Sequence, residues 1–295
     1  MKEKFKRGVF MGLSRKVASA NYMREQQAIF ACPVCHEKME VTDECVVTCE
    51  NHHTFDIAKQ GYVNFMTHAA TSMYGKDLFE ARKQIIGSGL YAPLHQAIVE
   101  LLLTFKQDIK VLDTGCGEGS HLAKIKQKFE GAIGLQMVSA GIDIAKEGII
   151  TAGRNYEEMI WCVGDLAKSP FQKSSFDVIL NILSPANYKE FRRLLSPNGC
   201  VVKVVPQSGY LHQLRELFFA DSDKESYSNN HTVERFKENF SNVTVQRITQ
   251  TVAINEELVP MLLHMTPMGW HQVADIDQTK VKEITIDLDI LIGKV

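Results

Sequence analysis

An acidic side chain followed by closely spaced glycines marks the centre of the sequence. The apolar residues Val111 and Leu112 lead into Asp113, and three glycines follow at alternate positions: Gly115, Gly117 and Gly119. Glycine lets the backbone adopt turn conformations that a side chain would forbid, and it lets the backbone approach a ligand closely. Apolar residues then recur at helical spacing from His121 and Leu122 onward. The segment therefore predicts a strand, a tight turn and a helix that bind a nucleotide-type cofactor.

Two further acids help to choose that cofactor. Asp143 closes the apolar segment 138–142, and Asp165 closes the segment 160–164. In a dinucleotide fold a pyrophosphate lies on the helix N-terminus. The glycine spacing here is tighter than in that fold, and Asp113 stands where it would face and repel a phosphate. A sulfonium or an ammonium group would not be repelled, so the charges favour a cationic cofactor.

The pattern D-x-G-C-G-x-G, from Asp113 to Gly119, resembles the first motif of class I S-adenosylmethionine-dependent methyltransferases. The resemblance implies that Asp143 binds both ribose hydroxyls and that Asp165 faces the adenine. Segments 243–254 and 284–292 alternate apolar and polar residues, which indicates the last two antiparallel strands of a seven-stranded mixed sheet. The predicted fold is a Rossmann-like α/β domain. The alternative, three ordinary strand-end acids, is disfavoured by their order and spacing.

Composition limits the class of protein and its possible partners. The 295 residues are 45% hydrophobic, enough for one large core and a smaller module. The net charge of -2 does not indicate nucleic acid, although residues 1–24 carry seven basic side chains against Glu3 alone. We expect this arm to be disordered; an RNA-binding arm is the alternative. No apolar run is long enough for a signal or a membrane span, so a cytoplasmic protein is expected.

Four cysteines between residues 32 and 49 favour a metal over disulfides in a reducing compartment. Cys32 and Cys35 form a C-x2-C knuckle, and Cys49 precedes His52 and His53. Thiolates and imidazole match the preference of zinc, so a tetrahedral Cys3His site is predicted. Other side chains that compete for a ligand position are His36, Cys45 and His52; Cys45 is interpreted as structural. Four ligands close the site, which gives the zinc a folding role.

The sequence F-D-I-A-K-Q-G-Y-V-N follows at residues 55–64. Together with the cysteine pattern, it is similar to the N-terminal zinc module of bacterial 23S rRNA guanine-N1 methyltransferases. The similarity continues at residues 80–83, 89–94 and 263–270. It implies the zinc ligands Cys32, Cys35, Cys49 and His53. The family modifies hairpin 35 of the peptide exit tunnel at G745 or at G748, the second being favoured here, and some members confer macrolide resistance.

The resemblance also implies roles in cofactor binding and assembly. It places Tyr91 against the cofactor and a polar residue of segment 206–212 beside it, where Tyr210 takes the aligned position. The full set of expected cofactor-binding residues is Tyr91, Asp113, Gly115, Gly117, Gly119, His121, Leu122, Asp143, Asp165 and Tyr210. The expected partners are 23S rRNA and a second copy in a homodimer, without a membrane. The expected cofactors are S-adenosylmethionine and structural Zn²⁺.

Guanine N1 keeps its proton at neutral pH, so a general base or a site that stabilises the deprotonated ring is expected. The base must also leave its pairing to expose N1. The turn at residues 181–185 departs from the N-P-P-Y motif of methyltransferases that act on amino groups. The candidates at this end of the sheet are Asn181, Tyr210 and His212, which the sequence does not rank.

The chain divides into four predicted parts: a basic arm at 1–28, a zinc-binding RNA-recognition module at 29–66, a linker and helices covering the cofactor at 67–107, and the methyltransferase domain at 108–295. Two other functions are compatible with the sequence. One is a small-molecule methyltransferase with an incidental zinc module, and the other is a non-catalytic RNA-binding protein with this fold. The intact glycine turn and its acids argue against the second.

Overall fold

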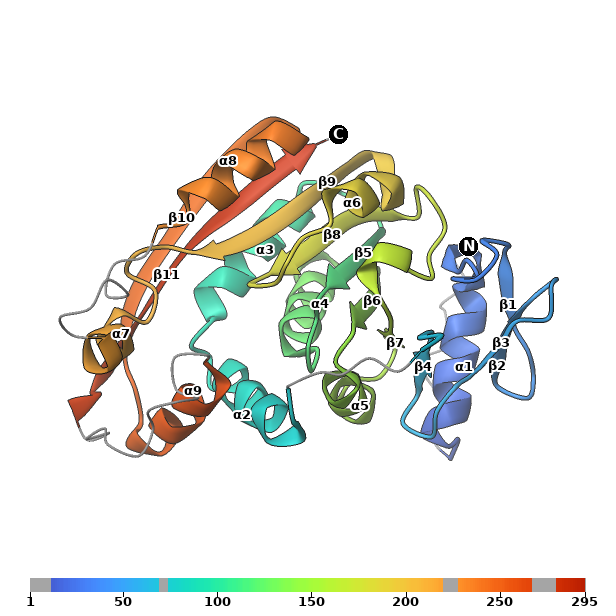
Figure 1. The fold of residues 1–295 in the computed structure, drawn as a ribbon, viewed down its shortest axis with the longest axis horizontal. Coiled ribbons are helices and arrows are strands. Elements are labelled where there is room, and N and C mark those ends of the chain that lie inside the picture. Colours follow the sequence, from blue (N-terminus) through green and yellow to red (C-terminus); the bar gives the residue numbers. More distant parts are fainter. Residues whose placement is uncertain (1–11, 69–73, 220–227, 267–279, 295) are drawn as a thin grey trace.

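A computed structural model of the protein describes residues 12–68, 74–219, 228–266 and 280–294 (Figure 1). Its centre is an eight-stranded sheet in the order β10-β11-β9-β8-β5-β6-β7-β4. The strands are β4 (Tyr62–Asn64), β5 (Ile109–Thr114), β6 (Met137–Asp143), β7 (Ile160–Val163), β8 (Phe176–Ile182), β9 (Leu195–Pro206), β10 (Ser241–Ala253) and β11 (Glu283–Lys294). Strands from β9 to β4 are parallel, and β11 pairs antiparallel with both β9 and β10. The seven predicted strands are therefore present, and β4 adds an eighth.

Alternate residues of the central strands enter two separate apolar layers. On β5, Val111 belongs to one layer and Leu112 to the other. Because both faces of the sheet are covered, the sequences of these strands are continuous runs of apolar residues. The first layer is covered by α2 (Lys76–Gly87), α3 (Ala92–Leu103), α4 (Ser120–Ile133), α5 (Lys146–Asn155), α7 (His212–Phe219) and α9 (Val259–Met265). The second is covered by α6 (Tyr188–Leu194), α8 (Asn230–Asn239) and the N-terminal module.

The N-terminal module contains α1 (Arg15–Glu25) and a three-stranded antiparallel sheet. The strands of this small sheet are β1 (Met39–Val41), β2 (Val46–Cys49) and β3 (Thr54–Asp56). Disorder was expected throughout residues 1–28, and α1 corrects that expectation; residues 1–11 lie outside the described residues. Ser14 caps the helix by accepting from the Val17 N–H, and Met23 is buried against the module. A basic helix is thus stable here because one face packs on other elements.

Strand β4 joins this module to the central sheet. Val63 on β4 pairs with Cys162 on β7 in parallel register, and Figure 1 places α1 beside β4. The preceding Gly61 has a φ of +84°, and a Cβ atom there would overlap Ser19 Oγ of α1. Only glycine allows the helix to lie this close. Phe30 of the module stacks against Phe171 of the larger domain, with ring centroids 6.1 Å apart.

Short 3-10 helices complete the described fold: η1 (Gln27–Ile29), η2 (Leu166–Lys168) and η3 (Glu256–Leu258). The charged and polar segment 221–239 predicts a surface excursion. Residues 221–227 lie outside the described residues, and residues 230–239 form α8, whose Phe236 is fully buried. Within the part of the chain described here, no single helix is long and apolar enough to cross a membrane. Helices α2 and α3 reach that length together only across a 75° bend.

Candidate cofactor cavity and zinc centre

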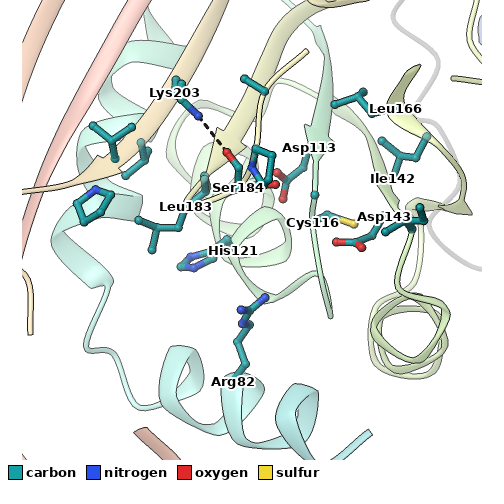
Figure 2. A pocket seen from close by; sticks show the side chains of 18 of the residues that line it. Arg82, Asp113, Cys116, His121, Ile142, Asp143, Leu166, Leu183, Ser184 and Lys203 are labelled. Atoms are coloured by element: carbon teal, nitrogen blue, oxygen red, sulfur yellow. Dashed lines mark hydrogen bonds between the residues drawn. The ribbon is translucent and has the colours of Figure 1, made fainter. Parts of the chain in front are cut away.

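A cavity of about 860 Å³ opens at the carboxyl ends of the parallel strands. This is where open α/β sheets bind ligands, and the volume lies in the range of small-molecule sites. Seven of the ten predicted cofactor-binding residues line it: Tyr91, Asp113, Gly115, His121, Asp143, Asp165 and Tyr210. Figure 2 shows Asp113 and Asp143 on neighbouring strands at the cavity wall.

Asp113 is buried at the end of β5, and its Oδ1 atom has no hydrogen-bond partner among the described residues. Burial, with the nearby carboxylates of Asp143 and Glu118, raises the pKa of Asp113 from 3.8 to about 8. A buried carboxylate without a partner is costly. A cation in the cavity would offset that cost, so the site fits a group that carries a positive charge.

Asp143 closes β6 and holds the glycine-rich turn. Its Oδ2 accepts the Gly117 N–H at 2.8 Å, and its Oδ1 accepts the Ala145 N–H at 2.8 Å. Burial raises the pKa of Asp143, and the two backbone donors oppose that rise. Each carboxylate oxygen can accept a second hydrogen bond, so Asp143 can still receive ribose hydroxyls. Asp165 lines the cavity near the end of β7 and caps η2 by accepting the Ala167 N–H.

The other three predicted residues support the turn from behind, outside the cavity lining. Gly119 has a φ of +81°, and a Cβ atom there would overlap the Trp161 ring. Gly117 also has a positive φ, and its N–H is the donor to Asp143. Leu122 is fully buried in the core under α4. These residues shape the turn, and their contact with a cofactor stays a prediction.

Two aromatic pairs form the far wall of the cavity. The hydroxyls of Tyr91 and Tyr210 are 2.6 Å apart, although 119 positions separate them in sequence. His121 Nδ1 lies 2.8 Å from His95 Nε2, and the His121 ring meets the Tyr91 ring edge-on. Burial lowers the pKa of both histidines, that of His95 to about 4. The lowered pKa values favour the neutral form of both imidazoles.

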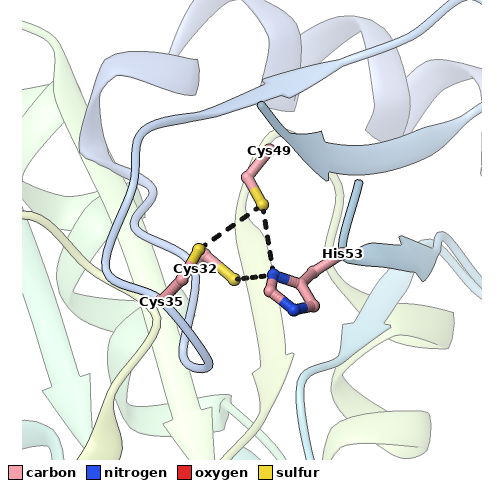
Figure 3. A group of neighbouring side chains, drawn as sticks. All are labelled: Cys32, Cys35, Cys49 and His53. Carbon is pink, nitrogen blue, oxygen red and sulfur yellow. Dashed lines mark hydrogen bonds between the residues drawn. The ribbon is translucent and has the colours of Figure 1, made fainter. Parts of the chain in front are cut away.

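The N-terminal module brings four predicted ligands together (Figure 3). His53 Nδ1 lies 3.5 Å from Cys32 Sγ and 3.5 Å from Cys49 Sγ, and Cys35 Sγ lies 3.7 Å from Cys49 Sγ. A tetrahedron with Zn–S bonds of about 2.3 Å has edges of about 3.7 Å, so the four donors fit a zinc ion. Cys45 lies outside this group, in the turn immediately before β2.

Comparison with known proteins agrees with both sites. Residues 30–68 match the model of the RlmA N-terminal zinc ribbon, and residues 105–269 match a methyltransferase domain. YxjB of Bacillus subtilis, which bears the name of a 23S rRNA (guanine-N1)-methyltransferase, is 41% identical over 90% of this chain and 97% of its own. The chain belongs to this methyltransferase family.

Two other matches are more distant. The 23S rRNA (guanine-748-N1)-methyltransferase of Streptomyces fradiae is 29% identical over 86% of this chain and 90% of its own. The solved structure of YcgJ from Bacillus subtilis overlaps 66% of this chain and 95% of its own at 17% identity, with a TM-score of 0.40. As a member of the family, the enzyme has S-adenosylmethionine and a structural zinc ion as its cofactors.

The three predicted catalytic candidates of this methyltransferase occupy different environments. Asn181 is fully buried on β8, where its amide donates to Thr114 and to the Pro185 carbonyl. Its Oδ1 accepts from the Lys203 ammonium, so Asn181 shapes the turn after β8 from outside the cavity lining. His212 also lies outside the lining, and its Nδ1 is 3.2 Å from the Gly209 carbonyl oxygen. Only Tyr210 reaches the cavity.

Three cations of the methyltransferase cavity, Arg82, Lys203 and Arg235, were missed in the sequence. Arg82 reaches from α2 toward the turn that carries Cys116, and Lys203 lies beside Ser184 (Figure 2). The guanidinium of Arg82 opposes the rise in the pKa of Asp143. Arg82 lies within the family-like segment 80–83, but its place among other charged residues of an amphipathic helix did not indicate that it faces the cavity. Lys203 gave a signal, since it is the single charge in the apolar run 200–205.

Proposed function

We propose that this enzyme transfers a methyl group from S-adenosylmethionine to N1 of a guanine in hairpin 35 of 23S rRNA. The observation that carries the proposal is the buried, unpartnered Asp113 oxygen in a cavity of cofactor size, on a chain that also holds the family's zinc centre. The sulfonium supplies an already activated methyl group when the cofactor is bound. The protein has to hold the guanine in line with it and exclude water.

The proposed roles follow from charge and position. Asp113 and Asp143 receive the cationic and hydroxyl groups of the cofactor, as their acceptor atoms allow. Arg82 points into the same cavity from α2 and is suited to the cofactor carboxylate. Tyr91 and Tyr210 close the far side. The zinc module contributes to RNA recognition, and we assign that role on the resemblance of residues 55–64 together with the module's fixed attachment through β4.

Within hairpin 35, the proposed target is the guanine at the G748-type position. The Streptomyces fradiae relative bears that position in its name, and its match covers 86% of this chain. The same resemblance supports a homodimer as the RNA-binding form and a cytoplasmic location. A small-molecule methyltransferase is the competing function.

Primer extension across hairpin 35 tests the proposal, because a methyl group on guanine N1 blocks base pairing and halts reverse transcriptase. We expect a stop in rRNA from the parent strain, its loss when the gene is deleted, and its return when the gene is restored. The position of the stop distinguishes G748 from G745. Stops that are unchanged by deletion would reject the rRNA assignment and favour a small-molecule substrate.

A further inference from the structure

A buried lysine lines the cavity next to the turn that follows β8, and Ser184 of that turn packs against Gly115. Lys203 on β9 has 4% of its surface exposed and still contributes to the cavity lining. Its ammonium donates to Asn181 Oδ1 at 2.6 Å and to the Ser184 carbonyl oxygen at 3.0 Å. Both acceptors belong to β8 and the turn that follows it. The third N–H of the ammonium has no acceptor among the described residues.

The charge of Lys203 is also uncompensated. No described carboxylate forms an ion pair with it, and burial lowers its pKa from 10.5 to about 8. The charged and titratable groups on the elements packed around it are Asp113 on β5, Tyr188 on α6, His231 and Arg235 on α8, and Asp289 on β11. Of these, Arg235 lies over the Tyr188 ring, and Asp289 accepts from Gln207 and Asn229.

The proposed reaction creates a need for such a cation. Guanine becomes a nucleophile at N1 only when N1 loses its proton, and the resulting negative charge is shared between N1 and O6. A hydrogen-bond donor placed at O6 would hold that charge and lower the cost of deprotonation. A fixed ammonium group in a water-poor cavity is stronger in this role than the same group in water.

Resting on the proposed function, we propose that Lys203 donates a hydrogen bond to O6 of the target guanine and stabilises its N1-deprotonated form. The N1 proton passes to water. The N1 electron pair then forms the bond to the methyl carbon while the carbon–sulfur bond breaks, and its electron pair stays on sulfur as a neutral thioether. Lys203 keeps its proton throughout, and Asn181 and the Ser184 carbonyl hold its ammonium in place.

Single-turnover methylation of a hairpin-35 transcript between pH 6.5 and pH 9 tests this role. Lys203→Gln keeps donors for Asn181 and Ser184 but removes the charge. We expect its rate at pH 7 to fall about 100- to 1,000-fold, the usual loss for one such donor. The deficit should shrink as pH rises, since guanine N1 then ionises without help. Lys203→Arg, which keeps a positive charge, should recover part of the rate.

Lys110→Gln on β5 is the matched control, because it removes a strand lysine at the amino ends of the parallel strands, away from the cavity at their carboxyl ends. Calorimetric binding of S-adenosylhomocysteine checks that each variant retains its fold. If Lys203→Gln does not fold, Lys203→Arg is compared with the wild type. The wild-type rate should fall at alkaline pH as Lys203 loses its proton, whereas the rate of Lys203→Arg should not, because arginine stays protonated. A deficit that is constant across pH, or no deficit, overturns the inference. No methylation of the transcript by the wild type would instead reject the proposed function.

Discussion

Asp113 illustrates how a single side chain can be unfavourable for the free protein and necessary for its ligand. Its carboxyl group is buried without a partner for Oδ1, and its folded pKa of about 8 lies far above the ordinary value of 3.8. Because the folded pKa is the higher one, the associated stability is complete below about pH 4 and is lost as pH rises toward 8. A cation bound in the cavity reverses this penalty.

We therefore predict opposite effects of Asp113→Asn on stability and on binding. Without ligand at pH 8, the variant should melt about 2–4 °C higher than the wild type for each kcal/mol of penalty removed, and the difference should vanish near pH 4. Its affinity for S-adenosylmethionine should fall about 10- to 100-fold, the range for a lost bond to a charged group. Affinity for S-adenosylhomocysteine, which keeps the ammonium but has a neutral sulfur, identifies the group that Asp113 faces: an equal loss indicates the ammonium, and a smaller loss indicates the sulfonium.

Calorimetric titrations measure the affinity for each ligand, and thermal melts at several pH values measure the stability of the free protein. Asp108→Asn is the control, since Asp108 accepts the Gln136 N–H at the opposite end of β5 and is exposed. An Asp113→Asn variant that binds both ligands as the wild type does would contradict the assignment of Asp113 to the cationic group.

At the scale of elements, Cys32 and Cys35 come from a knuckle, Cys49 from the end of β2 and His53 from the turn before β3, so the ion ties these short segments together. Loss of a ligand should therefore unfold the module, because binding of a structural zinc ion stabilises such domains by about 10–16 kcal/mol. We predict that Cys49→Ser loses its zinc and melts at a lower temperature.

Cys45→Ser should retain one zinc per chain, because Cys45 is a buried neighbour outside the ligand group. Zinc content measured by atomic absorption after dialysis separates the two variants. Zinc retained by Cys49→Ser, or lost from Cys45→Ser, would show that the ligand set is wrong.

The elements were largely predictable because their signals are local. Strands β5 and β6 are apolar runs, and α2 ends where the helix-breaking sequence Gly87-Ser88-Gly89 begins. The contacts that complete the site were harder to predict, because they join residues that are far apart in the sequence. Nothing local connects Tyr91 to Tyr210, and Arg82 looks like any exposed helix arginine. Helix α1 escaped prediction because its stability comes from the module on which it packs.

At the scale of the whole molecule, β4 makes the zinc module part of the central sheet. Tyr62, Val63 and Asn64 pair with Trp161, Cys162 and Val163, and Arg15 of α1 forms an ion pair with Glu157 beyond α5. Module and catalytic domain therefore share one hydrogen-bonded scaffold. The distance from the zinc centre to the cavity is fixed by that scaffold, which suits the proposed selection of one guanine in an rRNA hairpin.

This sharing predicts one unfolding transition for the zinc-loaded protein. Differential scanning calorimetry should show a single peak, and zinc release followed with a chromophoric chelator should coincide with it. S-adenosylhomocysteine at 100 times its Kd should raise both together by about 5–10 °C, as expected for about 2.7 kcal/mol of ligand stabilisation. A peak for zinc release that does not move with the ligand would mean that the module unfolds independently.

The pairing of β4 with β7 also bears on how the chain is made. Tyr62 emerges about 100 residues before Trp161, its partner, and at about 5–20 residues per second this interval lasts about 5–20 s. During that time β4 is an unpaired strand edge, the kind of surface that promotes aggregation. The nascent module already contains all four zinc ligands by residue 53. Capture of the metal can thus order the residues around β4 while the rest of its sheet is still being synthesised.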